Sequence, residues 1–161
     1  MLMSQAGLAS LALGGCGFKL RGSQNFVFTR IAIMPDPGGA VAVELRRSFG
    51  AGVRVLASDE SLDNAQLVLD ILQEQREKTV VGISSSGQVR EFQLRIRVKF
   101  KVRTPQGKEL LPESEIVQQR DISFNESAVL AKEAEESLLY RDMQADVVQQ
   151  LMRRLTAVKQ L

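Results

Sequence analysis

The sequence predicts an α+β fold: a two-layer sandwich of two helices on one face of a mostly antiparallel (mixed) sheet of about four strands. Three patterns support this. Residues 91–103 alternate between apolar and polar side chains without a break, as in a strand with one buried face. Residues 66–83 are also strand-like, and residues 84–87 (SSSG) are expected to close a hairpin. Residues 139–158 carry apolar side chains every three or four positions, which is typical of a helix packed on a core.

The remaining elements are expected in the order strand, helix, strand before the hairpin, with one further strand after it. Residues 28–34 alternate enough for a strand, and the sequence PDPGG stops it. Residues 40–49 predict a short helix, because their apolar residues recur every four positions. Residues 53–57 and 116–124 are expected to be strands. The last helix could be capped by Asn125 or Ser127, although its periodicity is clear only from about Glu136.

The hairpin has an expected register. If Ile83 pairs with Gln88, paired residue numbers sum to 171, whereas a slip of two residues would keep the faces and change the partners. The pairs expected are Leu69–Val102 and Ile71–Phe100 on the inner face, and Asp70–Lys101 and Glu74–Arg97 on the outer face. Polar Gln73, Gln75 and Glu77 would then lie on the inner face. The hairpin is therefore expected to extend beyond the core, with its tip exposed to water or to a partner.

Composition argues against an enzyme. The 161 residues are 44% hydrophobic and 25% charged, which suits one globular domain over residues 28–161. The chain contains no histidine, so a Ser-His-Asp or Cys-His site is impossible, and neither a metal nor another cofactor is expected. Catalysis by carboxylates alone is the remaining enzymatic alternative. The nearest acidic cluster, at residues 133–136, is expected to be a solvated helix face. A net charge of +2 with 5% aromatic residues fits nucleic-acid binding poorly.

The single cysteine, Cys16, predicts lipidation. Residues 1–15 contain no charged side chain, and the sequence LGGC at residues 13–16 has the form of a bacterial lipobox, although the usual positively charged start is missing. We expect a lipoprotein signal peptide over residues 1–15, diacylglyceryl and N-acyl groups on Cys16, and a lipid-anchored tether over residues 16–27. The alternative is an idle or buried cysteine. No apolar run after Cys16 approaches the ~20 residues that a membrane-spanning helix needs.

A row of cations marks the outer face of the strand at residues 91–103. It spans about 27 Å at ~3.4 Å per residue. Its members are Arg95, Arg97, Lys99, Lys101 and Arg103. The row could bind phosphates and sugar acids of a glycolipid, or carboxylates in the polar lumen of a barrel. It could equally be an ordinary solvated face. The hairpin tip could likewise dock by strand addition or be a surface loop.

Several segments together resemble the LptE family of lipopolysaccharide-assembly lipoproteins. They are CGFKLRG at residues 16–22, SGQ at 86–88 leading into EFQL at 91–94, LAKEAEE at 130–136, and QLMRRL at 150–155. The similarity extends over nearly the whole chain after the lipobox in element order, although no single stretch is a long identity.

This resemblance implies a fold, a location and a role. It implies two helices on a mostly antiparallel sheet, and a lipid-anchored protein in the periplasmic leaflet of the outer membrane. It also implies a one-to-one complex with the LptD barrel, which such a protein plugs, and binding of lipopolysaccharide for delivery to the outer leaflet. The alternative is a periplasm-facing structural adaptor or assembly chaperone that never binds glycolipid.

Overall fold

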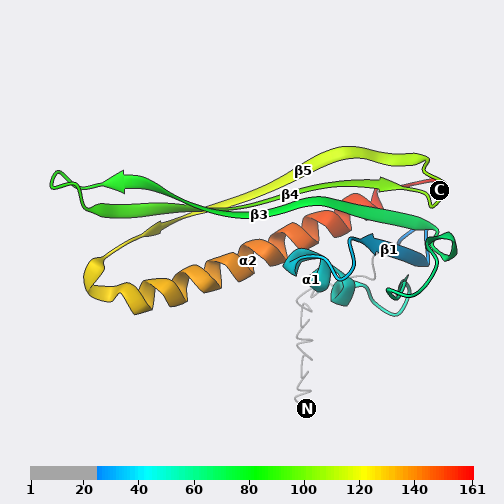
Figure 1. Cartoon of the computed structure of the whole chain (residues 1–161), viewed down its shortest axis with the longest axis horizontal. Coiled ribbons are helices and arrows are strands. Elements are labelled where there is room, and N and C mark those ends of the chain that lie inside the picture. The colour runs from blue at the N-terminus through cyan, green and yellow to red at the C-terminus, as the bar shows by residue number, and fades with distance from the viewer. Residues whose placement is uncertain (1–24) are drawn as a thin grey trace, which may run out of the picture.

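A mixed five-stranded sheet forms one layer of the molecule and two helices form the other (Figure 1). The computed structural model describes residues 25–161, so Cys16, the predicted signal peptide and most of the predicted tether lie outside it. The elements are β1 (Arg30–Met34), α1 (Ala40–Ser48), β2 (Arg54–Val55), η1 (Leu62–Asn64), β3 (Leu67–Ile83), β4 (Val89–Arg103), β5 (Glu109–Ser123), η2 (Glu126–Ala128) and α2 (Val129–Thr156). The predicted class is confirmed, with five strands where about four were expected.

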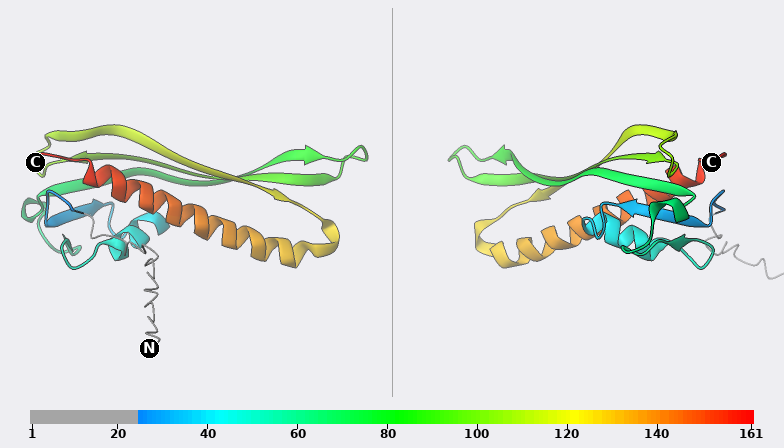
Figure 2. Two further views of the ribbon diagram at one scale, coloured as in Figure 1. Left: turned by 180° about the vertical axis from the view of Figure 1, so that it is seen from behind. Right: turned by 45° about the vertical axis from the view of Figure 1, so that its right-hand side comes forward.

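The sheet has the strand order β2-β1-β3-β4-β5. β1 runs parallel to both of its neighbours, while β3, β4 and β5 are antiparallel. Both helices cover the same face, and the β3–β4 hairpin extends past them at one end (Figures 1 and 2). We call this end of the molecule the distal end and the helix-covered face of the sheet the inner face.

The core lies between the inner face of the sheet and two helical segments, α1 and the C-terminal half of α2. Alternate residues of β4 from Leu94 to Val102 are fully buried there, as their alternation predicts. The buried residues of α2 are Met143, Val147, Val148, Leu151, Met152 and Leu155. A smaller apolar cluster, which includes Ala32, Leu56 and Val68, packs separately from this core.

A β-bulge at Leu72 changes the predicted hairpin register. Leu69–Val102, Asp70–Lys101 and Ile71–Phe100 pair as expected, but Gln73 then opposes Lys99 because Leu72 has no partner. The extra residue exchanges the two faces of β3 beyond this point. Two predictions are therefore wrong. Glu74 opposes Val98 instead of Arg97, and the polar inner-face residues are Glu74, Arg76 and Lys78 instead of Gln73, Gln75 and Glu77.

Several element ends also differ from the prediction. Ile83 pairs with Val89, while Ser84 and Gln88 close the loop through the Ser84 N–H, which donates to the Gln88 carbonyl at 2.8 Å. β5 begins seven residues before the predicted position 116, because Pro112 and the charged residues around it hide the strand pattern. Asn125 caps η2, whose Ser127 N–H donates to the Asn125 side chain, and α2 follows at once.

Candidate functional site

The predicted cation row lies on the outer face of the sheet, away from both helices. Three of its five members form ion pairs. Arg95 and Arg97 both approach Glu77, at 3.4 and 3.7 Å, and Arg97 also binds Glu115 at 3.0 Å. Arg103 makes two hydrogen bonds to Asp70, at 2.7 and 3.3 Å, so this carboxylate is held by Arg103 and not by the directly opposite Lys101. Carboxylates on the neighbouring strands thus neutralise much of the row. Such neutralisation is what we expect of an ordinary solvated face.

Lys99 and Lys101 differ from the three arginines. Within the described residues, no carboxylate oxygen lies within 4.0 Å of either ammonium group. Both side chains are only partly exposed, since neighbouring strands flank them. In the same row, Arg95 Nε is buried without a hydrogen-bond partner among the residues described. The row therefore offers two ammonium groups that a phosphate or a carboxylate could engage.

On the inner face, distal β3 meets the helices through polar groups. The Glu74 carboxylate accepts a hydrogen bond from the Val41 N–H at the start of α1, with both oxygens at 3.2 Å. Arg76 donates to Gln144 of α2 at 2.6 Å and lies over the ring of Tyr140, with Cζ 5.3 Å from its centroid. Lys78 pairs with Glu136 of α2 at 2.6 Å. These contacts hold α1 and α2 against a part of β3 that carries no apolar core residue.

Tyr140 completes this set of contacts. Its hydroxyl donates to the Glu77 carbonyl at 2.7 Å, so it fastens α2 to the backbone of β3. Burial of the hydroxyl raises the pKa of Tyr140 above its ordinary value of 10, and the nearby Glu136 carboxylate adds to that increase. The phenol therefore remains neutral and able to donate at neutral pH.

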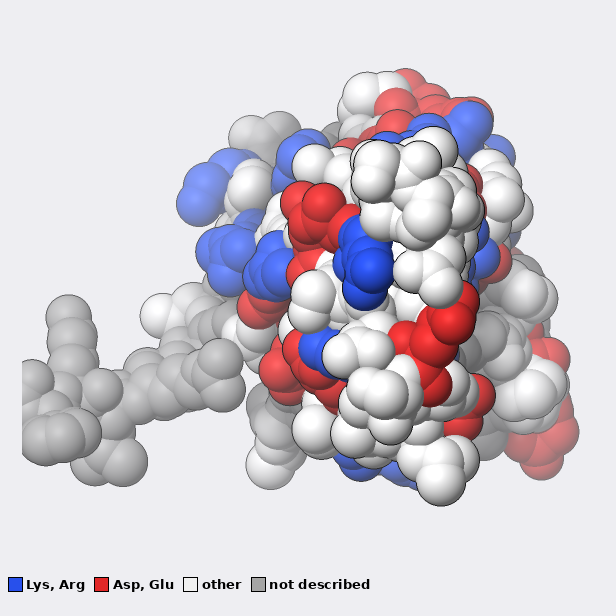
Figure 3. All heavy atoms as spheres, turned by 90° about the vertical axis from the view of Figure 1, so that its left-hand side faces the viewer, with Lys and Arg blue, Asp and Glu red and all other residues white. Residues whose placement is uncertain are grey.

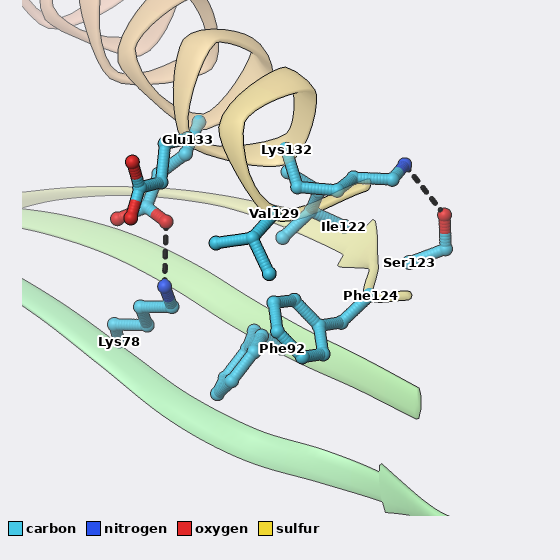
Figure 4. Close-up of a pocket in the computed structure, with 9 residues that line it drawn as sticks. Lys78, Phe92, Ile122, Ser123, Phe124, Val129, Lys132 and Glu133 are labelled. Carbon is cyan, nitrogen blue, oxygen red and sulfur yellow. Dashed lines mark hydrogen bonds and ion pairs between the residues drawn. The ribbon is translucent and has the colours of Figure 1, made fainter. Parts of the chain in front are cut away.

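A cavity of about 240 Å³ opens between the start of α2 and the distal sheet (Figure 4). Phe92, Phe124 and Val129 point toward one another across it, and the two rings meet edge to face with centroids 5.3 Å apart. Charged groups surround this apolar centre. The full lining is Lys78, Phe92, Ile122, Ser123, Phe124, Val129, Lys132, Glu133 and Glu136.

The distal end also exposes apolar side chains. Val80, Val81 and Ile83 near the hairpin tip are 45%, 49% and 68% exposed, and Leu130 in the first turn of α2 is 82% exposed. The hairpin tip and the start of α2 lie at the same end of the molecule in every view (Figures 1 and 2). Seen end-on, uncharged surface occupies much of this end, interspersed with charges of both signs (Figure 3).

Sequence reasoning missed the cavity. Its lining comes from β3, β4, β5 and α2, and the bulge at Leu72 decides that Lys78 points into it. The one available signal in the sequence was that apolar residues recur only weakly at helical spacing before Glu136. Such weak spacing indicates a helix segment that buries few side chains.

The described residues show no metal-binding cluster. Over residues 25–161, no three acidic or cysteine side chains gather where they could hold a metal ion. No helix in that range combines the length and apolarity needed to cross a membrane. The features present are a charged sheet face, a small amphipathic cavity and exposed apolar groups at one end. Together they define an α+β domain whose surfaces are suited to binding.

The chain belongs to the LptE family. The family model described as "LptE: Lipopolysaccharide-assembly" matches residues 28–155. A relative named LPS-assembly lipoprotein LptE, from Yersinia enterocolitica, is 30% identical over 161 residues, covering 98% of this chain and 76% of its own. A protein of the same name from Pectobacterium atrosepticum is 28% identical over 155 residues, covering 94% of this chain and 83% of its own.

Solved structures agree with the fold. The solution structure of an uncharacterized lipoprotein B from Nitrosomonas europaea has a TM-score of 0.75 and 35% identity, covering 88% of this chain and 91% of that one. The crystal structure of the rare lipoprotein B from Shewanella oneidensis has a TM-score of 0.65 at 22% identity, covering 80% and 94%. The second likeness supports the fold alone.

Proposed function

We propose that this protein is an outer-membrane lipoprotein anchored in the periplasmic leaflet by lipid on Cys16. In this role it plugs the LptD barrel in a one-to-one complex, binds lipopolysaccharide and assists both its delivery to the outer leaflet and the assembly of the barrel. Membership of the lipopolysaccharide-assembly family supports the general role. The protein would work by binding and placement, and not by covalent chemistry.

The outer face of the sheet carries the proposal. Both helices lie on the opposite face, so the polar side chains of β4 remain available to a partner. The lumen of an outer-membrane barrel is polar, which suits an alternating charged sheet face and not an apolar one. Lys99 and Lys101 are the two cations of the row best placed for a new partner, because the arginines already bind Glu77, Glu115 and Asp70.

One experiment tests the lipopolysaccharide contact. We expect Lys99→Ser/Lys101→Ser to weaken binding of purified lipopolysaccharide several-fold and to reduce its salt dependence, because two phosphate-binding cations are lost. Arg153→Ser/Arg154→Ser is the matched control, since it removes the same charge from the exposed C-terminal turn of α2. Equal losses in both variants would point to general charge attraction and would remove the contact from this face.

Purification in detergent tests the partner. We expect the full-length protein to co-purify with a large β-barrel in equal amounts, and its native mass to include the acyl groups on Cys16. If Lys99→Ser/Lys101→Ser lowers barrel recovery but leaves lipopolysaccharide binding intact, the row contacts the barrel. A protein that purifies alone and binds no lipopolysaccharide would instead be an adaptor or assembly chaperone.

A further inference from the structure

The two halves of α2 are anchored in different ways. All six buried residues of this helix lie at or after Met143. From Val129 to Asp142, half of the helix length, no residue is buried. Burial of apolar side chains is the main force that holds a helix on a sheet, so it acts mainly on the C-terminal half. In the N-terminal half, only the partly buried Leu139 and Tyr140 pack against the core. We call Val129–Asp142 the arm.

Polar contacts hold the arm against β3. Lys78 Nζ lies 2.6 Å from a Glu136 oxygen, and the Tyr140 hydroxyl donates to the Glu77 carbonyl at 2.7 Å. The side chains of Lys78 and Glu136 are 38% and 22% exposed, so water competes for this ion pair. Such pairs contribute little to stability. Lys132 Nζ also donates to the Ser123 hydroxyl of β5 at 3.0 Å, and Arg76 of β3 lies over the Tyr140 ring. The arm is thus held mainly by exposed or half-exposed polar contacts, whereas the C-terminal half of α2 is held by buried apolar side chains.

Behind the arm lies the cavity with the Phe92–Phe124 pair at its centre. Its volume of about 240 Å³ is below the ~300–1,000 Å³ of typical small-molecule sites, so the closed form admits only a slender group. Its charged lining consists of two lysines and two glutamates, which balance. A balanced rim gives no net attraction to a phosphate, whereas the apolar centre favours an uncharged, flexible hydrocarbon.

Exposed apolar groups continue from the cavity toward the distal end. Val80 opposes Phe92 in the β3–β4 register and is 45% exposed. Val81 and Ile83 are further exposed apolar residues between Val80 and the hairpin tip. A hydrocarbon chain leaving the cavity could therefore remain in contact with apolar side chains along part of its length.

We propose that this cavity is an acyl-chain site, and that the arm opens to admit one acyl chain between α2 and the sheet. The inference builds on the proposed function, because the chain would come from lipopolysaccharide. It concerns the hydrocarbon part of that molecule, whereas the cation row concerns its phosphates and sugar acids.

Binding of a dansyl-labelled undecanoic acid, competed by tetradecanoate, tests the site directly. Val129→Asp places a carboxylate at the apolar centre and should weaken probe binding about tenfold or more. Leu130→Asp is the matched control. It makes the same change one residue later, on a side chain that is 82% exposed and does not line the cavity, and should change binding less than twofold. Equal effects in the two variants, or no saturable binding by the parent protein, would overturn the site.

The arm is tested by two further substitutions. Glu136→Gln breaks the ion pair with Lys78 and should increase the association rate of the probe at least twofold. Glu133→Gln removes the same charge from the same cavity lining, but Glu133 makes no ion pair among the described residues. It should leave the rate unchanged. If the two variants behave alike, the ion pair does not control entry and the opening of the arm is refuted.

Comparing lipopolysaccharide with its deacylated form separates this inference from the proposed function. We expect the acylated form to displace the probe and the deacylated form, with its phosphates intact, to leave it bound. If both forms bind the protein but neither displaces the probe, the acyl site is wrong while the proposed function stands. If tetradecanoate displaces the probe and neither lipopolysaccharide form binds, the acyl site stands and the lipopolysaccharide part of the proposed function fails.

Discussion

Replacing Glu74 by alanine should destabilise the protein through a helix cap supplied from a distant strand. The N-cap residue of α1 is Gly39, which has no side chain to accept a hydrogen bond. Glu74 of β3 takes this role, with both carboxylate oxygens 3.2 Å from the Val41 nitrogen. Its negative charge also lies at the positive end of the helix dipole. Glu74→Ala removes both interactions and leaves the Val41 N–H without this acceptor.

The size of the effect follows from these two losses. Removal of an N-cap side chain costs about 1 kcal/mol, and loss of a charge at a helix terminus costs about 0.3–1 kcal/mol. We therefore expect the free energy of unfolding to fall by about 1.5 kcal/mol. For a domain of this size that corresponds to a decrease in Tm of about 4–6 °C. Urea unfolding followed by circular dichroism measures the first quantity, and calorimetry measures the second.

Two controls test the reasoning behind this prediction. Gln73→Ala changes the neighbouring outer-face residue and should alter stability by less than about 0.5 kcal/mol. Gly39→Ala should cost up to about as much as Glu74→Ala in the parent protein, because an added Cβ would displace the Glu74 carboxylate from the cap, and much less in the Glu74→Ala background. Additive effects of Gly39→Ala and Glu74→Ala, or a larger loss in Gln73→Ala than in Glu74→Ala, would refute the capping contact and the bulge that places it.

Three further predictions concern the core, the outer face and Tyr140. Leu151→Ala should lower the free energy of unfolding by about 2–5 kcal/mol in urea titrations, whereas Leu138→Ala, at a 53% exposed position of the same helix, should change it by less than about 0.5 kcal/mol. Asp70→Asn should cost about 1–2 kcal/mol in the same assay, because it weakens the two hydrogen bonds from half-buried Arg103. The folded-state pKa of Tyr140 is raised, so its contribution to stability is complete below pH ~10 and is lost as pH rises through the folded pKa. Tyr140→Phe should reduce this alkaline loss in unfolding curves measured between pH 9 and 11; an unchanged pH dependence would contradict the assignment.

The alternation of β4 made most of the fold predictable. Each inward residue from Leu94 to Val102 is buried. The alternating pattern over residues 91–103 was therefore enough to identify a strand, its buried face and the presence of a second layer. The apolar stripe of α2 was equally informative from Met143 onward. Before Glu136 the stripe fades, and the structure gives the reason: no residue of the arm is buried, and its only side chains packed against the core are Leu139 and Tyr140, which follow Glu136. A weak helical pattern here reflected packing, and the helix itself is continuous.

The bulge at Leu72 could not be read from the sequence, because one unpaired residue leaves the local pattern of β3 almost unchanged. Its effect on the site is large. Without it, Gln73, Gln75 and Glu77 would face α2, and Glu77 would bring a carboxylate toward the acidic side of the arm near Glu136. With it, Lys78 meets Glu136 on the inner face, while Glu77 meets the arginines of the outer face. The bulge at Leu72 thus places a cation opposite the acidic arm on the inner face, and a carboxylate beside the cation row on the outer face. The bulge therefore allows the Lys78–Glu136 ion pair that holds the arm. It also places Glu77 beside the arginines, so that Lys99 and Lys101 are the cations of the row still available to a partner.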